Sequence, residues 1–294
     1  MSRSRLKIWI MASRPKTLWA AVSPVLIGSV MAVRADGFHL AAAFAALIGA
    51  MMIQIGTNFA NDYFDYRKGT DRSDRLGPTR VTQAGLVAPE TMKRAVAVAF
   101  TLAAVAGLYL IWRGGWPILI IGVLSILFGI LYTAGPYPLG YHGLGELFVL
   151  VFFGPVAVGG TYYVQVGQIG LPILVAGLSP GLFSVAILTV NNLRDIETDR
   201  SSGKRTLAVV FGRTFARLEY VAVIVTACAI PALLTWRGYG SVWLLLSLIV
   251  IPVAVPAVRT VLSNTDGEAL NDVLASTGRL LLLFSILFCA GWML

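Results

Sequence analysis

Long apolar stretches alternate along the chain with short polar segments. Residues 95–112 and 171–190, for example, contain no charged side chain. A helix needs about 20 predominantly apolar residues to cross the hydrocarbon core of a bilayer. The pattern therefore predicts an all-α membrane protein, a single domain over residues 1–294, with about nine membrane-spanning helices. The predicted spans are residues 18–33, 40–60, 92–112, 116–133, 144–164, 171–192, 218–235, 241–260 and 275–294.

Composition agrees with lipid as the main solvent of this chain. The 294 residues are 57% hydrophobic and only 13% charged, and the mean hydropathy is +0.79. Charged residues make up about 25% of a typical soluble domain. The two cysteines, Cys228 and Cys289, fall inside predicted spans and lack the spacing of a metal site or disulfide framework, so we expect buried apolar residues.

The net charge of +9 is an orientation signal rather than the mark of a nucleic-acid-binding protein. With the N-terminus placed in the cytoplasm, five Lys and Arg precede the first span, seven lie in 61–94, six in 193–217 and two beside the last two spans. Only Arg34, Arg113 and Arg237 fall on the other side. Because cytoplasmic loops carry most Lys and Arg, this asymmetry predicts a cytoplasmic N-terminus and an external C-terminus.

The 14 Asp and Glu residues are the rarer and more informative charges. Four lie in 62–74 and three in 195–199, at the predicted inner ends of the second and sixth spans. Ionisable groups beside a membrane span are costly, so they are functional candidates by default. We therefore expect the functional site at two Asp-rich inner loops, 61–91 and 193–217.

Both acidic segments contain the pattern Asn-x-x-x-Asp, and the two copies begin 130 residues apart. In the first copy, Asn61 and Asp65 stack on one face of a helix, which Gly69 can end. In the second, the same face carries a row of three residues: Asn191, Asp195 and Asp199. One such pair at a helix end is often a solvated cap, but two copies in a chain with few acids indicate a site.

Hard oxygen ligands at this spacing suit Mg²⁺, which takes one or two carboxylates and shares its other positions with water and phosphate oxygens. Two facing acidic helices therefore predict a site in which Mg²⁺ holds a diphosphate. The candidate metal ligands are Asn61, Asp62, Asp65, Asp71, Asn191, Asp195 and Asp199. Basic residues of the same loops are candidates to bind the diphosphate, with membrane orientation as their alternative role: Arg67, Lys68, Arg72, Arg80, Lys204 and Arg205.

These motifs resemble those of the UbiA superfamily of intramembrane aromatic prenyltransferases, which carry one Asp motif after the second helix and one after the sixth. The resemblance implies four catalytic residues, Asn61, Asp65, Asp195 and Asp199. It covers nearly the whole chain and is strongest toward the branch that prenylates 1,4-dihydroxy-2-naphthoate. The segments that carry it are residues 14–18, 61–71, 77–80, 132–136, 191–195 and 203–209.

The resemblance implies helices around a central cavity that opens sideways to lipid, in a bacterial inner membrane, with the site loops cytoplasmic. It implies transfer of a polyprenyl chain from polyprenyl diphosphate to 1,4-dihydroxy-2-naphthoate, with loss of CO₂ and diphosphate, giving demethylmenaquinol for menaquinone biosynthesis. Arg14 or Lys16 is expected to pair with the acceptor carboxylate, and Tyr132 to steady an allylic cation. The chain departs from the longer family motif at Gly69, where Asp71 is the nearest carboxylate.

Two alternatives remain at this point. Within the same superfamily, the acceptor would be 4-hydroxybenzoate, homogentisate, haem or a chlorophyll precursor. From another class, a secondary transporter would use the Asp clusters to couple cation movement. Transporters place such residues near the bilayer midplane on broken helices, whereas these clusters lie at helix ends and run into basic loops. That position favours a diphosphate headgroup over an ion path.

Overall fold

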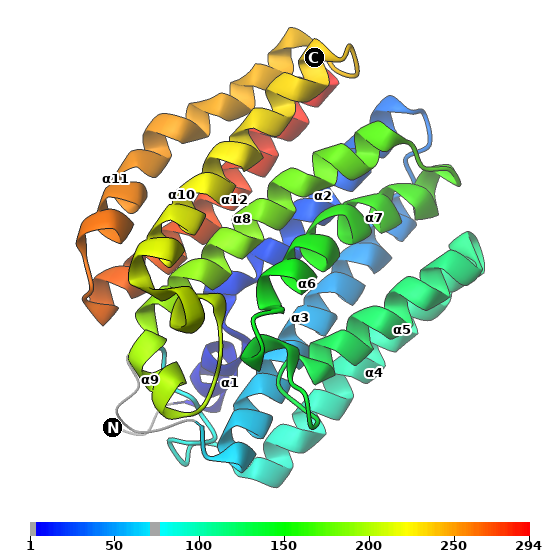
Figure 1. The fold of residues 1–294 in the computed structure, drawn as a ribbon. Coiled ribbons are helices and arrows are strands. Elements are labelled where there is room, and N and C mark those ends of the chain that lie inside the picture. The colour runs from blue at the N-terminus through cyan, green and yellow to red at the C-terminus, as the bar shows by residue number, and fades with distance from the viewer. Residues whose placement is uncertain (1–3, 71–76) are drawn as a thin grey trace.

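The computed structural model describes residues 4–70 and 77–294, and every regular element in this part of the chain is a helix (Figure 1). The elements are α1 (Arg5–Ser13), η1 (Pro15–Thr17), α2 (Trp19–Arg34), α3 (Leu40–Lys68), α4 (Pro89–Gly114), α5 (Trp116–Leu131), η2 (Leu139–Tyr141), α6 (Gly145–Val151), η3 (Phe152–Val156), α7 (Ala157–Val166), α8 (Leu171–Arg194), α9 (Ile196–Ser201), α10 (Leu207–Trp236), η4 (Val242–Ile249), α11 (Val250–Ser263) and α12 (Gly267–Met293).

The long helices run side by side, and α8 lies near the centre of the bundle (Figure 1). Side chains of α8 such as Phe183 and Val190 are fully buried, and α8 packs against α2, α10 and α12. The short helices α1 and α9 lie together at one end of the bundle, which also receives the end of α3. The two acidic segments are therefore brought to the same end of the molecule.

Helix ends follow local sequence rules at the positions that shape this end of the bundle. Gly69 ends α3 in the left-handed conformation with a φ of +67°, as expected from the sequence. Thr206 begins α10 by accepting a hydrogen bond from the backbone N–H of Val209. Arg14 adopts a strained φ of +52° directly before Pro15, and the chain then bends by 55° at Leu18, between Arg5–Thr17 and Trp19–Arg34.

The predicted count of nine spans is not confirmed, although a helix lies at each predicted position. In the described residues, seven helices are long and apolar enough to cross a membrane, and eight if the bent pair before Arg34 counts as one span. The missing span is α5, whose 16 residues extend about 24 Å. That length falls short of a hydrocarbon core of about 30 Å.

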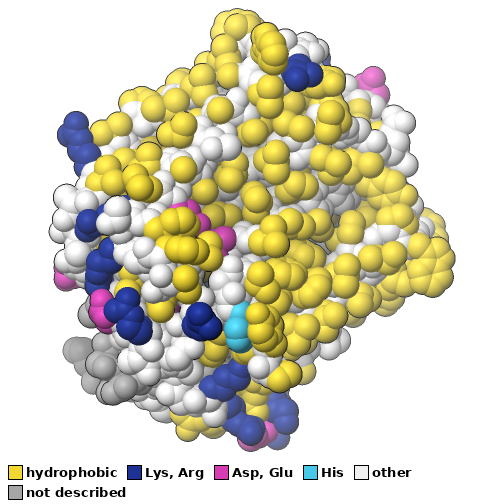
Figure 2. Space-filling view, in the orientation of Figure 1, with side chains coloured by type: hydrophobic (Ala, Val, Ile, Leu, Met, Phe, Trp, Pro, Cys, Tyr) yellow, Lys and Arg dark blue, Asp and Glu magenta, His cyan; other side chains and the backbone are white. Residues whose placement is uncertain are grey.

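The outer surface matches a lipid environment. Large apolar side chains face outward along the bundle, including Leu108 at 66% exposure and Leu171 at 63%. Figure 2 shows a broad hydrophobic face, with most of the visible Lys and Arg side chains gathered toward the end that carries α1 and α9. Together with the long apolar helices, this surface describes a multi-pass membrane protein.

Candidate active site

A polar pocket of about 190 Å³ lies between the two acidic segments. The ends of α3 and α8 form two of its walls, and the α1–η1 bend, the segment after α5 and the segment after α9 form the others. Its charged and amide side chains are Arg14, Gln54, Asn58, Asn61, Asp65, Arg80, Asn191, Asn192, Asp195, Asp199 and Lys204. The structure thus brings two motifs 130 residues apart in sequence into one cavity.

Asp65 is the most heavily contacted carboxylate of the first motif. Its Oδ2 accepts a hydrogen bond from Nη2 of the buried Arg80 at 3.1 Å, and its Oδ1 accepts one from the Tyr141 hydroxyl at 2.5 Å. One helical turn earlier, the Asn61 amide oxygen accepts a hydrogen bond from the Thr133 hydroxyl. The end of α3 is therefore held on the pocket side by residues far away in sequence.

Arg194 organises the second motif. Its side chain is fully buried, and its Nε and Nη2 donate to the two Asp195 carboxylate oxygens at 2.8 and 2.6 Å. Nη2 also donates to the Asn191 amide oxygen at 2.8 Å, and Nη1 donates to the Asn271 amide oxygen of α12 at 2.7 Å. A bidentate arginine of this kind fixes both the position and the charge of the carboxylate.

The backbone changes direction within the second motif without separating its two Asp residues. Helix α8 ends at Arg194 and α9 begins at Ile196, so Asp195 lies at the junction. The backbone N–H of Asp199 nevertheless donates to the carbonyl of Asp195 at 2.8 Å, which keeps the two residues one turn apart. Both side chains line the pocket.

Lys204 lies between the two motifs. Its Nζ is 3.5 Å from Oδ1 of Asp199 and 3.9 Å from Oδ2 of Asp65. A single ammonium group within 4 Å of a carboxylate from each motif shows that the motifs face each other across a short gap. The carboxylates along that gap are of the kind that binds a divalent cation, and the ammonium group is of the kind that binds a polyanion.

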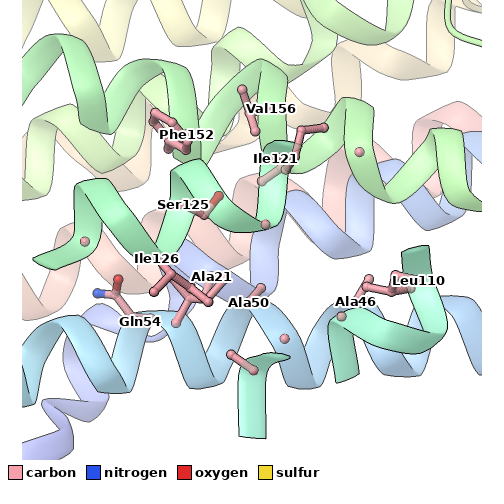
Figure 3. Close-up of a pocket in the computed structure, with 18 of the residues that line it drawn as sticks. Ala21, Ala46, Ala50, Gln54, Leu110, Ile121, Ser125, Ile126, Phe152 and Val156 are labelled. Carbon is pink, nitrogen blue, oxygen red and sulfur yellow. The ribbon is translucent and has the colours of Figure 1, made fainter. Parts of the chain in front are cut away.

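An apolar cavity of about 390 Å³ continues from the polar pocket into the bundle. Figure 3 shows side chains of α3, α5 and η3 directed toward this space, among them Ala50, Ile121 and Phe152. Six residues line both spaces and form the neck that joins them: Ala20, Gln54, Thr57, Tyr132, Val149 and Phe153. A polar head and an apolar tail of one substrate would therefore meet separate environments on either side of this neck.

Comparison with known proteins identifies the family that has this arrangement. The model of the UbiA prenyltransferase family matches residues 21–285. The chain belongs to this family. Two relatives are 1,4-dihydroxy-2-naphthoate octaprenyltransferases: that of Escherichia coli K12 is 37% identical over 98% of this chain and 96% of its own, and that of Mycobacterium leprae is 38% identical over 95% and 93%.

Solved UbiA structures share the fold. A UbiA homologue from Archaeoglobus fulgidus, solved with DMAPP and Mg²⁺, has a TM-score of 0.66 to this structure at 15% identity. The alignment covers 97% of this chain and 99% of that homologue. The likeness shows that this chain and that homologue share one fold over nearly their whole lengths.

The polar pocket of this UbiA-family chain contains some, but not all, of the residues predicted from the sequence. Asp71 and Arg72 lie outside the described residues. Five others are not among the residues that line the pocket: Lys16, Asp62, Arg67, Lys68 and Arg205. The Arg67 side chain turns back along α3 and donates to the Tyr63 hydroxyl at 3.1 Å, while Arg205 is exposed. The remaining predicted residues line the pocket, and Tyr132 lies at its neck.

Asp62 serves the loop after α3 instead of the pocket. Its carboxylate is buried, and its two oxygens accept hydrogen bonds from the backbone N–H groups of Val81 and Thr82, each at 3.1 Å. Both oxygens of Asp62 thus hold the segment after α3, and Arg80, the residue before Val81, contacts Asp65 from this segment. The Asp62 carboxylate therefore anchors this segment and does not line the pocket, and its assignment as a metal ligand stays a prediction.

We expect Asp62→Ala to act on stability. The substitution leaves two buried backbone donors without acceptors, which costs about 1–3 kcal/mol for each. A thermal melt in detergent should show a clearly lowered midpoint, whereas Asp272→Ala, at an exposed position of α12, should not. Native stability in the Asp62→Ala protein, together with weakened Mg²⁺ binding, would instead make Asp62 a ligand.

Sequence reasoning missed two residues at the centre of the site. Arg194 was visible beside Asp195 in the motif, and an arginine at an apolar helix end next to a carboxylate is a signal of a buried pair. Tyr141 carried no such signal, because its contact with Asp65 joins residues 76 positions apart. Asn192 of α8 also lines the pocket, and its side-chain amide donates to Oε1 of Glu146 on α6 at 2.9 Å. The Glu146 carboxylate therefore holds the α8 side of the pocket.

The donor set of the pocket fits Mg²⁺ shared with a substrate. In the described part of the chain, no three Asp, Glu, His or Cys side chains are close enough to form a metal site alone. Mg²⁺ does not require one, because it commonly uses one or two carboxylates with water and substrate phosphate oxygens. Asp65, Asp195 and Asp199 supply such carboxylates, and Asn61 and Asn191 supply amide oxygens beside them.

Proposed function

We propose that this chain transfers a polyprenyl group from polyprenyl diphosphate to 1,4-dihydroxy-2-naphthoate, with release of CO₂ and diphosphate, to give demethylmenaquinol for menaquinone biosynthesis. The observation that carries the proposal is the polar pocket between two Asp motifs, joined through a neck to an apolar cavity. Family membership and relatives that are naphthoate octaprenyltransferases supply the acceptor.

The two spaces match the two parts of a polyprenyl diphosphate. The diphosphate lies between the Asp motifs, where Arg80 and Lys204 lie beside the carboxylates and offset its charge. The first isoprene units pass through the neck into the apolar cavity. A cavity of about 390 Å³ is near the lower end of the roughly 300–1,000 Å³ that holds a drug-sized ligand, so a long tail extends beyond it into lipid.

Mg²⁺ would be held by Asp65, Asp195 and Asp199 with Asn61 and Asn191, and would supply charge stabilisation to the departing diphosphate. Arg80 fixes Asp65, and Arg194 fixes Asp195 and Asn191, so the oxygen donors are oriented before substrate binds. Lys204 contributes a cation between the motifs that neutralises charge on the leaving group.

The reaction takes place where the head of the chain meets the neck. The bond between prenyl C1 and the bridging oxygen breaks, and its electron pair leaves with the diphosphate. The ring carbon that bears the carboxylate forms the new C–C bond to C1. The bond to the carboxylate then breaks, CO₂ leaves, and that electron pair restores the aromatic ring. Tyr132 at the neck presents its side chain beside the carbon that carries the positive charge.

Arg14 is placed to receive the acceptor. It lines the polar pocket at the bend between α1 and η1, close to the neck residues Gln54 and Tyr132. Its guanidinium can pair with the naphthoate carboxylate, while Lys16 is exposed outside the pocket and serves the membrane surface. The acceptor ring then lies between Arg14 and the neck, within reach of the prenyl C1 atom.

We place the pocket end of the bundle on the cytoplasmic side of a bacterial inner membrane. Most Lys and Arg residues belong to this end by the predicted topology, and Figure 2 shows them gathered there on one face. Both soluble products, diphosphate and CO₂, would then be released to the cytoplasm, and the prenylated quinol would remain in the bilayer.

The test of this function uses purified protein with Mg²⁺, a radiolabelled polyprenyl diphosphate, and either 1,4-dihydroxy-2-naphthoate or 4-hydroxybenzoate. Prenylated naphthoquinol, formed together with CO₂ and abolished by EDTA, is the expected result. Product from the benzoate alone would move the enzyme to another branch of the family. The absence of diphosphate release with either acceptor would contradict a transferase and reopen the transport alternative.

We expect Ala50→Trp to shorten the prenyl chain that the enzyme accepts. Ala50 lies on α3 and faces the apolar cavity (Figure 3), so an indole there occupies space needed by the chain. Turnover of a long polyprenyl diphosphate should fall about tenfold or more, whereas turnover of the short geranyl diphosphate should remain native. The size of the effect follows from the cost of overpacking, about 1–3 kcal/mol. Ala41→Trp, at an exposed position of the same helix, is the matched control. Equal losses of turnover with the long and the short diphosphate would show that the prenyl group does not occupy the space beside Ala50.

A further inference from the structure

Tyr141 contacts the first Asp motif and the segment that follows the second. It ends the short helix η2, in the segment between α5 and α6, and it lines the polar pocket. Its hydroxyl donates to Asp65 Oδ1 at 2.5 Å and lies 3.1 Å from the Thr70 hydroxyl just after α3. The phenol therefore fixes the carboxylate of the first motif on the side opposite Arg80.

Two lysine ammonium groups lie close to the ring of Tyr141. Nζ of Lys204 is 4.7 Å from the ring centroid, and Nζ of Lys68 is 4.9 Å from it. Ammonium groups at this distance are attracted to the electron-rich face of an aromatic ring. Lys68 is also held by the carbonyl of Thr133, at 2.6 Å, so its place beside the ring is fixed.

The backbone of Tyr141 contacts the segment that follows the second motif. Its carbonyl accepts a hydrogen bond from the N–H of Arg205 at 2.8 Å, in the segment that follows α9. Lys204, the residue before Arg205, is the cation that lies within 4 Å of carboxylates from both motifs. Side chain, ring and backbone of one residue thus contact both halves of the pocket.

We propose that Tyr141 is a positioning residue for the diphosphate site. Its hydroxyl holds the Asp65 oxygens in the orientation that binds Mg²⁺, and its ring holds Lys204 at the leaving-group side of the pocket. The inference rests on the proposed function and adds a residue that acts through Asp65 and Lys204. These contacts hold Asp65 and Lys204 in place before the diphosphate binds. The entropic cost of ordering these side chains on binding is therefore lower.

The two contacts of the side chain are separable by mutation. Tyr141→Phe removes the hydroxyl and retains the ring, whereas Tyr141→Leu removes both. Tyr137→Phe is the matched control, because Tyr137 belongs to the same segment, is 58% exposed and stacks on His142 outside the pocket. The experiment measures two quantities for each protein. One is turnover, and the other is the rise in melting temperature caused by Mg²⁺ together with the unreactive analogue geranyl thiolodiphosphate.

The Tyr141→Phe protein should have a native melting temperature without ligand and a smaller rise with Mg²⁺ and the analogue. Its half-saturating Mg²⁺ concentration should increase about tenfold, as expected for the loss of one hydrogen bond to a charged group. Tyr141→Leu should in addition raise the KM for prenyl diphosphate, since Lys204 loses its aromatic partner. Tyr137→Phe should match the native protein in every measurement.

Native Mg²⁺ dependence and a native thermal response in Tyr141→Phe would overturn the inference, whether or not Tyr141→Leu folds. The thermal measurement contains no acceptor, so a wrong acceptor assignment would leave it intact and would show only as missing naphthoquinol in turnover. A native protein without any thermal response to Mg²⁺ and the analogue would overturn both the inference and the diphosphate site.

Discussion

Asp65→Asn should reduce prenyl transfer by about a hundredfold to a thousandfold while leaving the protein folded. The substitution retains the size of the side chain and an oxygen that can accept from Tyr141, but it removes the negative charge beside Arg80 and Lys204. Loss of one preorganised electrostatic contact at a reacting centre typically has an effect of this magnitude. Steady-state turnover at saturating Mg²⁺, with the melting temperature measured in parallel, checks the expectation.

The matched control for Asp65→Asn is Glu197→Gln. Glu197 lies on α9 close to the second motif in sequence, but its side chain is 65% exposed and pairs with Arg200 and Arg213. Exposed ion pairs of this kind contribute little, so turnover should remain native. Equal losses in the two variants would show that activity follows the overall charge of this end of the protein and not the carboxylate in the pocket.

Arg194→Met should lower the free energy of unfolding by about 3–5 kcal/mol, the cost of removing one partner from a buried ion pair. The methionine approximates the volume of the arginine stem, but Asp195 is left buried without its bidentate donor. Asn191 and Asn271 lose their donor as well. Unfolding by a denaturing detergent, followed by circular dichroism, provides the measurement.

Arg200→Met separates this effect from a general loss of positive charge. Arg200 pairs with Glu197 at the surface, and the two side chains are 56% and 65% exposed. The expected change in the free energy of unfolding is therefore within about 1 kcal/mol. If Arg194→Met were as stable as Arg200→Met, the buried network would not hold the second motif, and the pocket would need another source of rigidity.

Much of the fold follows from hydropathy, because a chain in lipid must satisfy its backbone within each helix. The stop of α3 at Gly69 also followed from local sequence, since only glycine adopts that conformation readily. The span count was less predictable. The α1–η1 and α2 pair bends at Leu18, and α5 is short, so length and composition alone do not assign either as a full span.

Helical spacing predicted which side chains of α3 share the face that lines the pocket, whereas a count of acids in the segment did not. Asn61 and Asp65 line the pocket, as the four-residue spacing predicts, whereas Asp62 is turned by about 100° and contacts the following loop. Arg67 lies about 200° around the helix from Asp65, and its side chain follows α3 away from the pocket. Counting the acids and bases of a segment therefore overestimates the number of side chains that line the pocket. The position of each residue around the helix corrects that number.

Sequence patterns did not predict the contacts between segments that are distant in the chain. Tyr141 meets Asp65 because the segment after α5 folds over the end of α3, and Arg194 meets Asn271 because α8 packs against α12. Neither relation has a periodicity or spacing that a single chain reveals. These residues contact the acids of the two motifs, so the placement of the acids in one pocket was predictable from the sequence, while their hydrogen-bond partners were not.

The most direct test of the site is an experimental structure of the protein with Mg²⁺ and geranyl thiolodiphosphate. We expect the diphosphate between Asp65 and the Asp195–Asp199 turn, with Mg²⁺ bound to these carboxylates and the prenyl chain passing Gln54 and Tyr132 into the apolar cavity. A diphosphate bound elsewhere, or a chain that leaves the pocket without entering the neck, would contradict the shared site of the two motifs.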